Sequence, residues 1–252
     1  WGSMYGTGGP LGYGSYPGQF FVPRQIAIDK YDNVYVADSV NHRIQKFSNS
    51  GVLLAYYGSY GTLNGYFQFP TGVAVDRKGN IFVADSENNR IQKFNSLFIF
   101  QKSWGKKGTG DGEFFQPMQI AIDSQDNVYV VDRINNRVQK FDNNGNFLAK
   151  WGTNNGSGNL DPLENWGEGP GDLFLPTGIA IDENDLVYVM DTSNNRVNVY
   201  DTNGRFIEQF GSFSGRAGDF FSPQGIGFTN DGEIIVADGL LHRIQFYKNQ
   251  NN

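Results

Sequence analysis

Residues 23–47 read PRQIAIDKYDNVYVADSVNHRIQKF, and the same theme returns four more times along the chain. The copies begin at prolines that are 47, 47, 59 and 47 residues apart, namely Pro23, Pro70, Pro117, Pro176 and Pro223. A fixed period of this size indicates an array of equivalent structural units. We therefore interpret residues 1–252 as one repeat domain whose units start near these prolines, with an inserted loop at 153–172.

Each copy contains four short segments rich in Ile, Val, Tyr and Phe. In the first copy these are residues 26–29, 34–38, 43–47 and 52–57, and Asp, Asn and Gly separate them. Short apolar runs bounded by turn-forming residues predict β-strands, and segments such as 30–33 suit tight hairpin turns. No segment has the apolar period of a helix. Four antiparallel strands per unit, repeated radially, predict an all-β protein of the β-propeller class with four-stranded blades.

The expected outer strands end in an aromatic residue followed by glycine, and this pattern leaves the number of blades open. The pairs are Tyr57-Gly58, Trp104-Gly105, Trp151-Gly152 and Phe210-Gly211, and the chain opens with Trp1-Gly2. The sequence stops at Asn252, where a fifth outer strand would begin, so both ends look trimmed. Five repeats predict a five-bladed ring with Trp1 against the fifth blade. A six-bladed ring with one blade missing from this sequence is the alternative.

Composition argues against several classes of function. The chain has no cysteine and two histidines, which excludes disulfides, thiolate metal sites and three-histidine centres. No apolar run approaches the ~18 residues of a membrane-spanning helix. No signal peptide opens the sequence, and a removed one is compatible with Trp at residue 1. The net charge of −6 argues against a nucleic-acid partner, which needs clustered Lys and Arg.

An Asp at the end of each second strand is followed five residues later by an Arg. The pairs are Asp38/Arg43, Asp85/Arg90, Asp132/Arg137, Asp191/Arg196 and Asp238/Arg243. A carboxylate beside a tight turn can accept backbone N–H groups and pair with a guanidinium. Catalysis needs an asymmetric set of groups whose pKa values are pushed apart. Because all five units carry the same pair, we interpret the pairs as structural, with an acid–base or cation site as the alternative.

The positions at which the units differ predict the functional surface, because a repeat scaffold binds where its copies are unlike. We expect the linkers before the prolines and the turns after the second strands to share one face. The predicted ligand-contacting residues there are Phe21, Arg24, Phe115, Met118, Arg133, Phe174 and Phe221, together with Trp166 in the inserted loop. For the phenylalanines, packing between blades is the alternative interpretation.

The linker between the third and fourth units is longer by 12 residues (59 − 47) and is the asymmetric feature of the chain. Its acids Asp161, Glu164, Glu168 and Asp172 are weak candidates for a Ca²⁺ site, because their spacing matches no EF-hand loop. A solvated surface loop is the alternative, so we predict no cofactor. Asn155 begins the one N-x-[ST] pattern in the sequence, which is a glycosylation acceptor if the protein is secreted.

The repeated pattern G-x-F-x-x-P-x-G-I-A-V-D, followed by Y-V-A-D-x-x-N-H-R-I-Q-x-F, resembles the NHL-repeat family. The resemblance covers essentially the whole chain, and residues 41–43 spell Asn-His-Arg. His42 and His242 both stand at the family's His position, and two imidazoles alone make a poor zinc site. The resemblance implies a β-propeller, usually six-bladed in this family, that serves in protein binding, RNA binding, sensing or, occasionally, catalysis.

The sequence therefore favours a non-catalytic interaction scaffold whose linker-rich face binds a protein or a glycan. We expect an extracellular or cell-surface location from the high content of Asn, Gly and Tyr, and the trimmed ends fit a module of a larger protein or assembly. One alternative is a metal-assisted lyase or hydrolase, which needs unlike acids or histidines to converge at the propeller axis. The other is an RNA-binding NHL domain, which the pI of about 4.9 disfavours.

Overall fold

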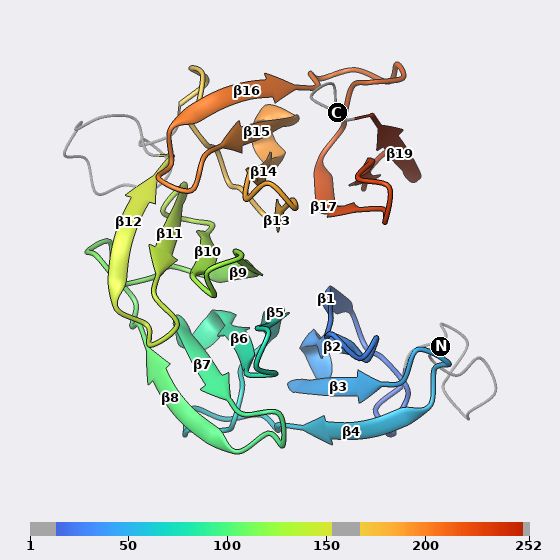
Figure 1. The fold of residues 1–252 in the computed structure, drawn as a ribbon, viewed down its shortest axis with the longest axis vertical. Coiled ribbons are helices and arrows are strands. Elements are labelled where there is room, and N and C mark those ends of the chain that lie inside the picture. Colours follow the sequence, from blue (N-terminus) through green and yellow to red (C-terminus); the bar gives the residue numbers. More distant parts are fainter. Residues whose placement is uncertain (1–13, 153–166, 249–252) are drawn as a thin grey trace. The chain divides into compact units, whose positions relative to one another are not determined.

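The chain folds into antiparallel β-sheets. The computed structural model describes residues 14–152 and 167–248, so Trp1 and Asn252, on which the predicted ring closure depends, lie outside the described residues. Consecutive strands form four four-stranded sheets and one three-stranded sheet (Figure 1). This confirms the predicted all-β class with antiparallel blades in five repeats. No helix in the described part of the chain is long and apolar enough to cross a membrane.

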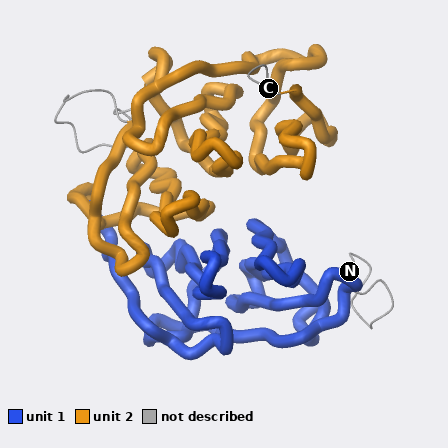
Figure 2. The backbone as a smooth tube through the Cα atoms, viewed as in Figure 1, with its two compact units in different colours: residues 1–108 blue, residues 109–252 orange. Residues whose placement is uncertain are grey.

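Two compact units divide the chain, residues 1–108 and residues 109–252 (Figure 2). Unit 1 contains blade 1, which is β1 (Pro23–Ile28), β2 (Val34–Asp38), β3 (Arg43–Phe47) and β4 (Leu53–Tyr57). It also contains blade 2, which is β5 (Pro70–Val75), β6 (Ile81–Asp85), β7 (Arg90–Phe94) and β8 (Phe100–Trp104).

Unit 2 contains the other three blades. Blade 3 is β9 (Pro117–Ile122), β10 (Val128–Asp132), β11 (Arg137–Phe141) and β12 (Phe147–Trp151). Blade 4 is β13 (Ile179–Ile181), β14 (Val187–Asp191), β15 (Arg196–Tyr200) and β16 (Phe206–Phe210). Blade 5 is β17 (Pro223–Phe228), β18 (Ile234–Asp238) and β19 (Arg243–Tyr247). Short 3₁₀ turns follow three of the second strands, namely η1 (Ser39–Asn41), η2 (Ser86–Asn88) and η3 (Thr192–Asn194).

The first strand of blade 1 begins at the repeat proline and ends one residue before the Asp that was expected to close it. Asp29 belongs to the following turn, where its Oδ1 accepts the backbone N–H groups of Tyr31 and Asn33 at 2.9 and 3.0 Å. Side-chain bonds to nearby backbone groups compete with the strand ladder. For this reason β1 stops at Ile28.

Neighbouring blades within a unit bury apolar side chains between them. In unit 1, Tyr35 and Ile44 of blade 1 form one buried cluster with Phe67, Val73 and Phe94. Phe67 lies in the linker that enters blade 2, is fully buried, and has its ring centroid 5.8 Å from that of Phe94. In unit 2 the matching linker residues are buried in the same way, and they are Phe114, Leu173 and Phe220. One linker side chain of each such blade is thus part of the core.

Candidate binding face

Each blade joins the linker that enters it to the turn that follows its second strand. The backbone carbonyl of the residue two before the proline accepts a hydrogen bond from a backbone N–H of that turn, at 3.1–3.2 Å. The donor and acceptor residues are Val40 and Phe21, Glu87 and Gln68, Ile134 and Phe115, Ser193 and Phe174, and Leu240 and Phe221. Linkers and turns therefore lie together, blade by blade. We call this surface of each unit the linker face, formed by linkers 14–22, 59–69, 106–116, 167–175 and 212–222 with turns 39–42, 86–89, 133–136, 192–195 and 239–242.

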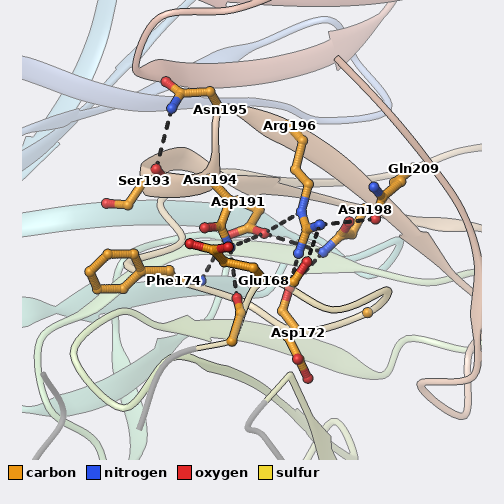
Figure 3. Close-up of polar contacts among 12 residues, drawn as sticks. Glu168, Asp172, Phe174, Asp191, Ser193, Asn194, Asn195, Arg196, Asn198 and Gln209 are labelled. Atoms are coloured by element: carbon orange, nitrogen blue, oxygen red, sulfur yellow. Dashed lines mark hydrogen bonds and ion pairs between the residues drawn. The ribbon is translucent and has the colours of Figure 1, made fainter. Parts of the chain in front are cut away.

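A buried Asp–Arg pair holds each linker in shape, and Figure 3 shows the pair of blade 4. Asp191 is fully buried; its Oδ2 accepts from Arg196 Nε at 2.7 Å and its Oδ1 accepts the N–H of Phe174 at 2.7 Å. The Nη atoms of Arg196 donate to the carbonyls of Glu168 and Asp172 at 2.9 and 3.0 Å. One ion pair thus binds the linker near both of its ends, and we call this arrangement the clamp.

The clamp recurs in the other blades. Its Nε–Oδ2 distances there lie between 2.7 and 3.1 Å, for Asp38–Arg43, Asp85–Arg90, Asp132–Arg137 and Asp238–Arg243. Burial raises the pKa of Asp191 to about 6, against the opposing hydrogen bonds from Phe174, Asn194 and Arg196. The same geometry, repeated in all five blades, braces the linkers.

The linker face exposes two groups of aromatic rings. In unit 1 the His42 ring lies 4.7 Å from the Phe69 ring and 5.0 Å from the Tyr60 ring, both edge-on, and Tyr60 is 63% exposed. In unit 2 Phe213, 65% exposed, meets Phe221 edge-on at 5.0 Å. We call these the His42 cluster and the Phe213 cluster. Exposed apolar groups that gather in patches mark interaction sites more often than scattered ones do.

The predicted ligand-contacting residues differ in exposure. Arg24 and Phe221 are exposed, whereas Phe21, Phe115, Met118, Arg133 and Phe174 are half-buried. Met118 packs against the core between blades 3 and 4. Trp166 lies outside the described residues. Of this set, the structure therefore places Phe221 in an exposed aromatic cluster.

The inserted loop is described in part. Asn155, Asp161 and Glu164 lie outside the described residues, whereas Glu168 is exposed and Asp172 is half-buried. The Asp172 carboxylate accepts a backbone N–H from three residues earlier at 3.2 Å. Within 14–152 and 167–248, no group of three or more His, Asp or Glu side chains is arranged to hold a metal ion.

Sequence reasoning missed three members of the two clusters, namely Tyr60, Phe69 and Phe213. Tyr60 and Phe213 both stand two residues after the glycine that ends an outer strand, in the triplets Gly-Ser-Tyr at 58–60 and Gly-Ser-Phe at 211–213. Each residue forms an isolated parallel bridge within its own linker, Tyr60 with Phe67 and Phe213 with Phe220. Tyr60 and Phe213 can be recognised in the sequence because each directly follows an aromatic–glycine–serine triplet.

A side chain from one blade also caps the linker of the next blade. Asn136 Oδ1 accepts the N–H of Leu175 at 2.8 Å, and in blade 1 the matching acceptor is His42 Nδ1, which takes the N–H of Phe69 at 3.1 Å. Imidazole accepts a hydrogen bond at Nδ1 only while that nitrogen is unprotonated. Burial lowers the pKa of His42, although the charge of Asp85 opposes this effect. Blade 1 thus carries a titratable group where blade 3 has an amide.

We expect His42→Asn to remove an acid-sensitive part of the stability. Because the pKa of His42 is lower in the folded than in the unfolded protein, its contribution is present above pH ~6.5 and is lost as the pH falls below that value. Urea unfolding is measured at pH 7.5 and 5.5. Between these two values the free energy of unfolding of the unmodified protein is expected to fall by about 0.5–1.5 kcal/mol more than that of His42→Asn, which is the net contribution of one hydrogen bond. His242→Asn, at the matching exposed position of blade 5, is the control. The same pH response with and without His42 would contradict the expectation.

Comparison with known proteins identifies the repeat. An NHL repeat model matches residues 22–47, 67–94 and 175–200. The chain is 34% identical to Protein brain tumor of Drosophila melanogaster over 79 residues, which are 31% of this chain and 8% of that protein. It is 38% identical to RING finger protein nhl-1 of Caenorhabditis elegans over 68 residues, which are 27% of this chain and 7% of that protein. The chain thus spans less than a tenth of these curated relatives.

Among solved structures, a streptogramin B lyase structure is similar to the chain with a TM-score of 0.63 and 15% sequence identity. The similarity covers 90% of this chain and 69% of that one. At this identity the likeness concerns the fold alone.

Proposed function

Because the chain belongs to the NHL-repeat β-propeller family, we propose that it is a non-catalytic binding scaffold that takes protein partners on its linker face, through the His42 cluster in unit 1 and, separately, through the Phe213 cluster in unit 2. The fold of this family supports a binding role. The observation that carries the proposal is that Tyr60 and Phe213 stay largely exposed on linkers whose backbone is clamped by buried ion pairs.

The clamp makes these rings suitable anchors. Phe221 N–H donates to Asp238 at 2.9 Å, and its carbonyl accepts from Leu240 N–H at 3.2 Å, so both sides of its backbone are held. An aromatic side chain on a fixed backbone loses little conformational entropy when a partner covers it. Aromatic residues also dominate the energetics of protein interfaces. A protein surface therefore fits the two clusters better than a polyanion does, because the net charge of the chain is −6.

We expect Tyr60→Ala to weaken peptides that bind the His42 cluster, and Phe213→Ala to weaken peptides that bind the Phe213 cluster, at least about tenfold, which corresponds to about 1.4 kcal/mol. The ligands are dodecapeptides selected on the immobilised protein from a random phage library, and their affinities are measured by titration calorimetry. Both side chains are largely exposed, so the substitutions are expected to leave folding unchanged. Leu148→Ala is the matched control, because Leu148 is exposed on the outer strand β12, away from the linker face.

Two further measurements separate the classes of ligand. A glycan array and a gel shift with single-stranded RNA are run on the same variants. Glycan or RNA binding that Tyr60→Ala or Phe213→Ala abolishes would contradict a protein partner. Selected peptides that bind both variants as tightly as the unmodified protein would contradict the assignment of the linker face.

The proposal includes an extracellular or cell-surface location, which rests on composition, with 33 Gly and 13 Tyr among 252 residues. Protease added to intact cells is expected to digest an epitope-tagged form of the protein and to spare an internal marker. Protection until the cells are lysed would contradict this location.

A further inference from the structure

The two units carry opposite net charges. Unit 1 has 11 Lys and Arg against 6 Asp and Glu, a net charge of +5, whereas unit 2 has 9 against 20, a net charge of −11. A charge asymmetry between the halves of a chain indicates an electrostatic interaction surface. Because salt screens exposed charges beyond about 8 Å at physiological ionic strength, the local sign of a surface decides which other surface it can contact.

The turns between the first and second strands of the blades show this asymmetry at equivalent positions. In unit 1 they read DKYDN at 29–33 and DRKGN at 76–80, and we call these the basic turns. In blades 4 and 5 they read DENDL at 182–186 and TNDGE at 229–233, without Lys or Arg, and we call these the acidic turns. A repeat scaffold binds where its copies are unlike, so these turns are a second place to expect a binding surface.

The basic turns lie together on unit 1 and expose their cations. The first strands of blades 1 and 2 are neighbours, because the N–H of Val73 donates to Gln25 Oε1 at 3.0 Å, and the turns follow these two strands. Asp32 is an exposed acid there. The exposed basic residues are Lys30, Arg77 and Lys78. The basic turns therefore present an excess of positive charge to a partner.

The acidic turns border one cavity of about 160 Å³ in unit 2. Its walls include Asp182 and Glu183 from one turn and Phe228, which directly precedes the other. An engineered protein cavity of about 150 Å³ takes a benzene molecule, so this cavity has room for the end of one long side chain. An aromatic wall beside carboxylates suits the ammonium group of Lys or the guanidinium group of Arg.

Asp182 lacks the cation that equivalent residues have in blades 1 and 3. There the carboxylates pair with lysines of the third strands, at 3.5 Å for Asp29 and Lys46 and at 3.7 Å for Asp123 and Lys140. Blade 4 has Val199 in place of these lysines. Among the described residues Asp182 forms no ion pair, and its Oδ2 accepts a hydrogen bond from the Tyr188 hydroxyl at 3.3 Å. The charge of Asp182 is thus available to a cation from outside its own blade.

We propose that copies of this chain associate with each other, the basic turns of one copy lying on the acidic turns of another and a Lys or Arg side chain entering the cavity beside Asp182. Complementary charge fixes which surfaces meet. Exposed ion pairs each contribute little, so we expect a dissociation constant of about 10–500 μM that rises with salt. A nucleic acid fits the basic turns less well, because three exposed cations neutralise few phosphates.

Two charge-reversal variants test this association. The unit 1 variant is Lys30→Glu with Lys78→Glu, and the unit 2 variant is Glu183→Lys with Asp231→Lys. Sedimentation velocity of the chain of residues 1–252 is expected to show association at about 50 mM NaCl and its loss at about 500 mM. Each variant alone is expected to associate at least about tenfold more weakly. An equimolar mixture of the two is expected to recover the association, because each reversed surface then meets a surface of opposite charge.

The controls separate this contact from the linker face and from misfolding. All four substituted side chains are exposed, and circular dichroism verifies that both variants are folded. Phe213→Ala is expected to associate like the unmodified protein. A monomer up to about 1 mM, association that the charge reversals leave unchanged, or a mixture that stays as weak as its components would each overturn the proposal. Single-stranded RNA that binds a monomeric chain and is lost in the unit 1 variant would assign the basic turns to nucleic acid instead.

Discussion

Replacing Arg196 with alanine is expected to lower the free energy of unfolding by about 3–5 kcal/mol, which is the typical cost of removing one partner of a buried ion pair. Asp191 is fully buried and would lose the cation 2.7 Å away that offsets its desolvation. The carbonyls of Glu168 and Asp172 would lose their donors as well. Urea denaturation followed by tryptophan fluorescence measures the change.

The matched control lies in the same blade. Arg205 pairs with Asp201 at 3.4 Å, but its side chain is 80% exposed, so Arg205→Ala is expected to cost no more than about 1 kcal/mol. Arg196→Lys keeps the charge and loses the forked geometry, so its stability is expected to lie between those of Arg196→Ala and the unmodified protein. Equal losses in Arg196→Ala and Arg205→Ala would show that the clamp contributes little.

Phe67→Ala is expected to destabilise the protein by about 3–5 kcal/mol. The ring of Phe67 is fully buried between blades 1 and 2, beside Phe94, and its removal leaves a cavity there. Leu63→Ala is the control, because Leu63 belongs to the same linker and is largely exposed, so its change is expected to stay within about 0.5 kcal/mol. A loss below about 1 kcal/mol in Phe67→Ala would mean that the blades pack without this linker residue.

Much of the fold is predictable from the sequence, because strands and turns recur in register with the prolines. The second and third strands of blade 1, Val34–Asp38 and Arg43–Phe47, match their expected ranges. The end of the first strand does not, because the side chain of Asp29 takes turn N–H groups that a strand pattern does not reveal. The contact between the Asp and the Arg of each clamp was also predictable, because the two residues stand on either side of a tight turn.

The site was less predictable, because its contacts join residues far apart in the sequence. Arg196 bonds to carbonyls 24–28 residues earlier, and backbone carbonyls have no signature in a sequence. Exposure was equally hidden. Met118 and Phe221 are both apolar residues near a repeat proline, yet Met118 packs on a core and Phe221 stands exposed beside Phe213. The difference arises from the neighbouring blades and from linker residues outside the repeated pattern.

The clamp has a consequence for how new specificities arise in such a chain. On the linker, Arg196 and the Asp191 Oδ1 atom bond to main-chain atoms, namely the carbonyls of Glu168, Gly169 and Asp172 and the N–H of Phe174. Every amino acid except proline offers these same atoms. Exposed linker side chains such as that of Glu168 are therefore exchangeable without loss of these bonds, so a library randomised at exposed linker positions is a route to recognition of new targets on an unchanged backbone.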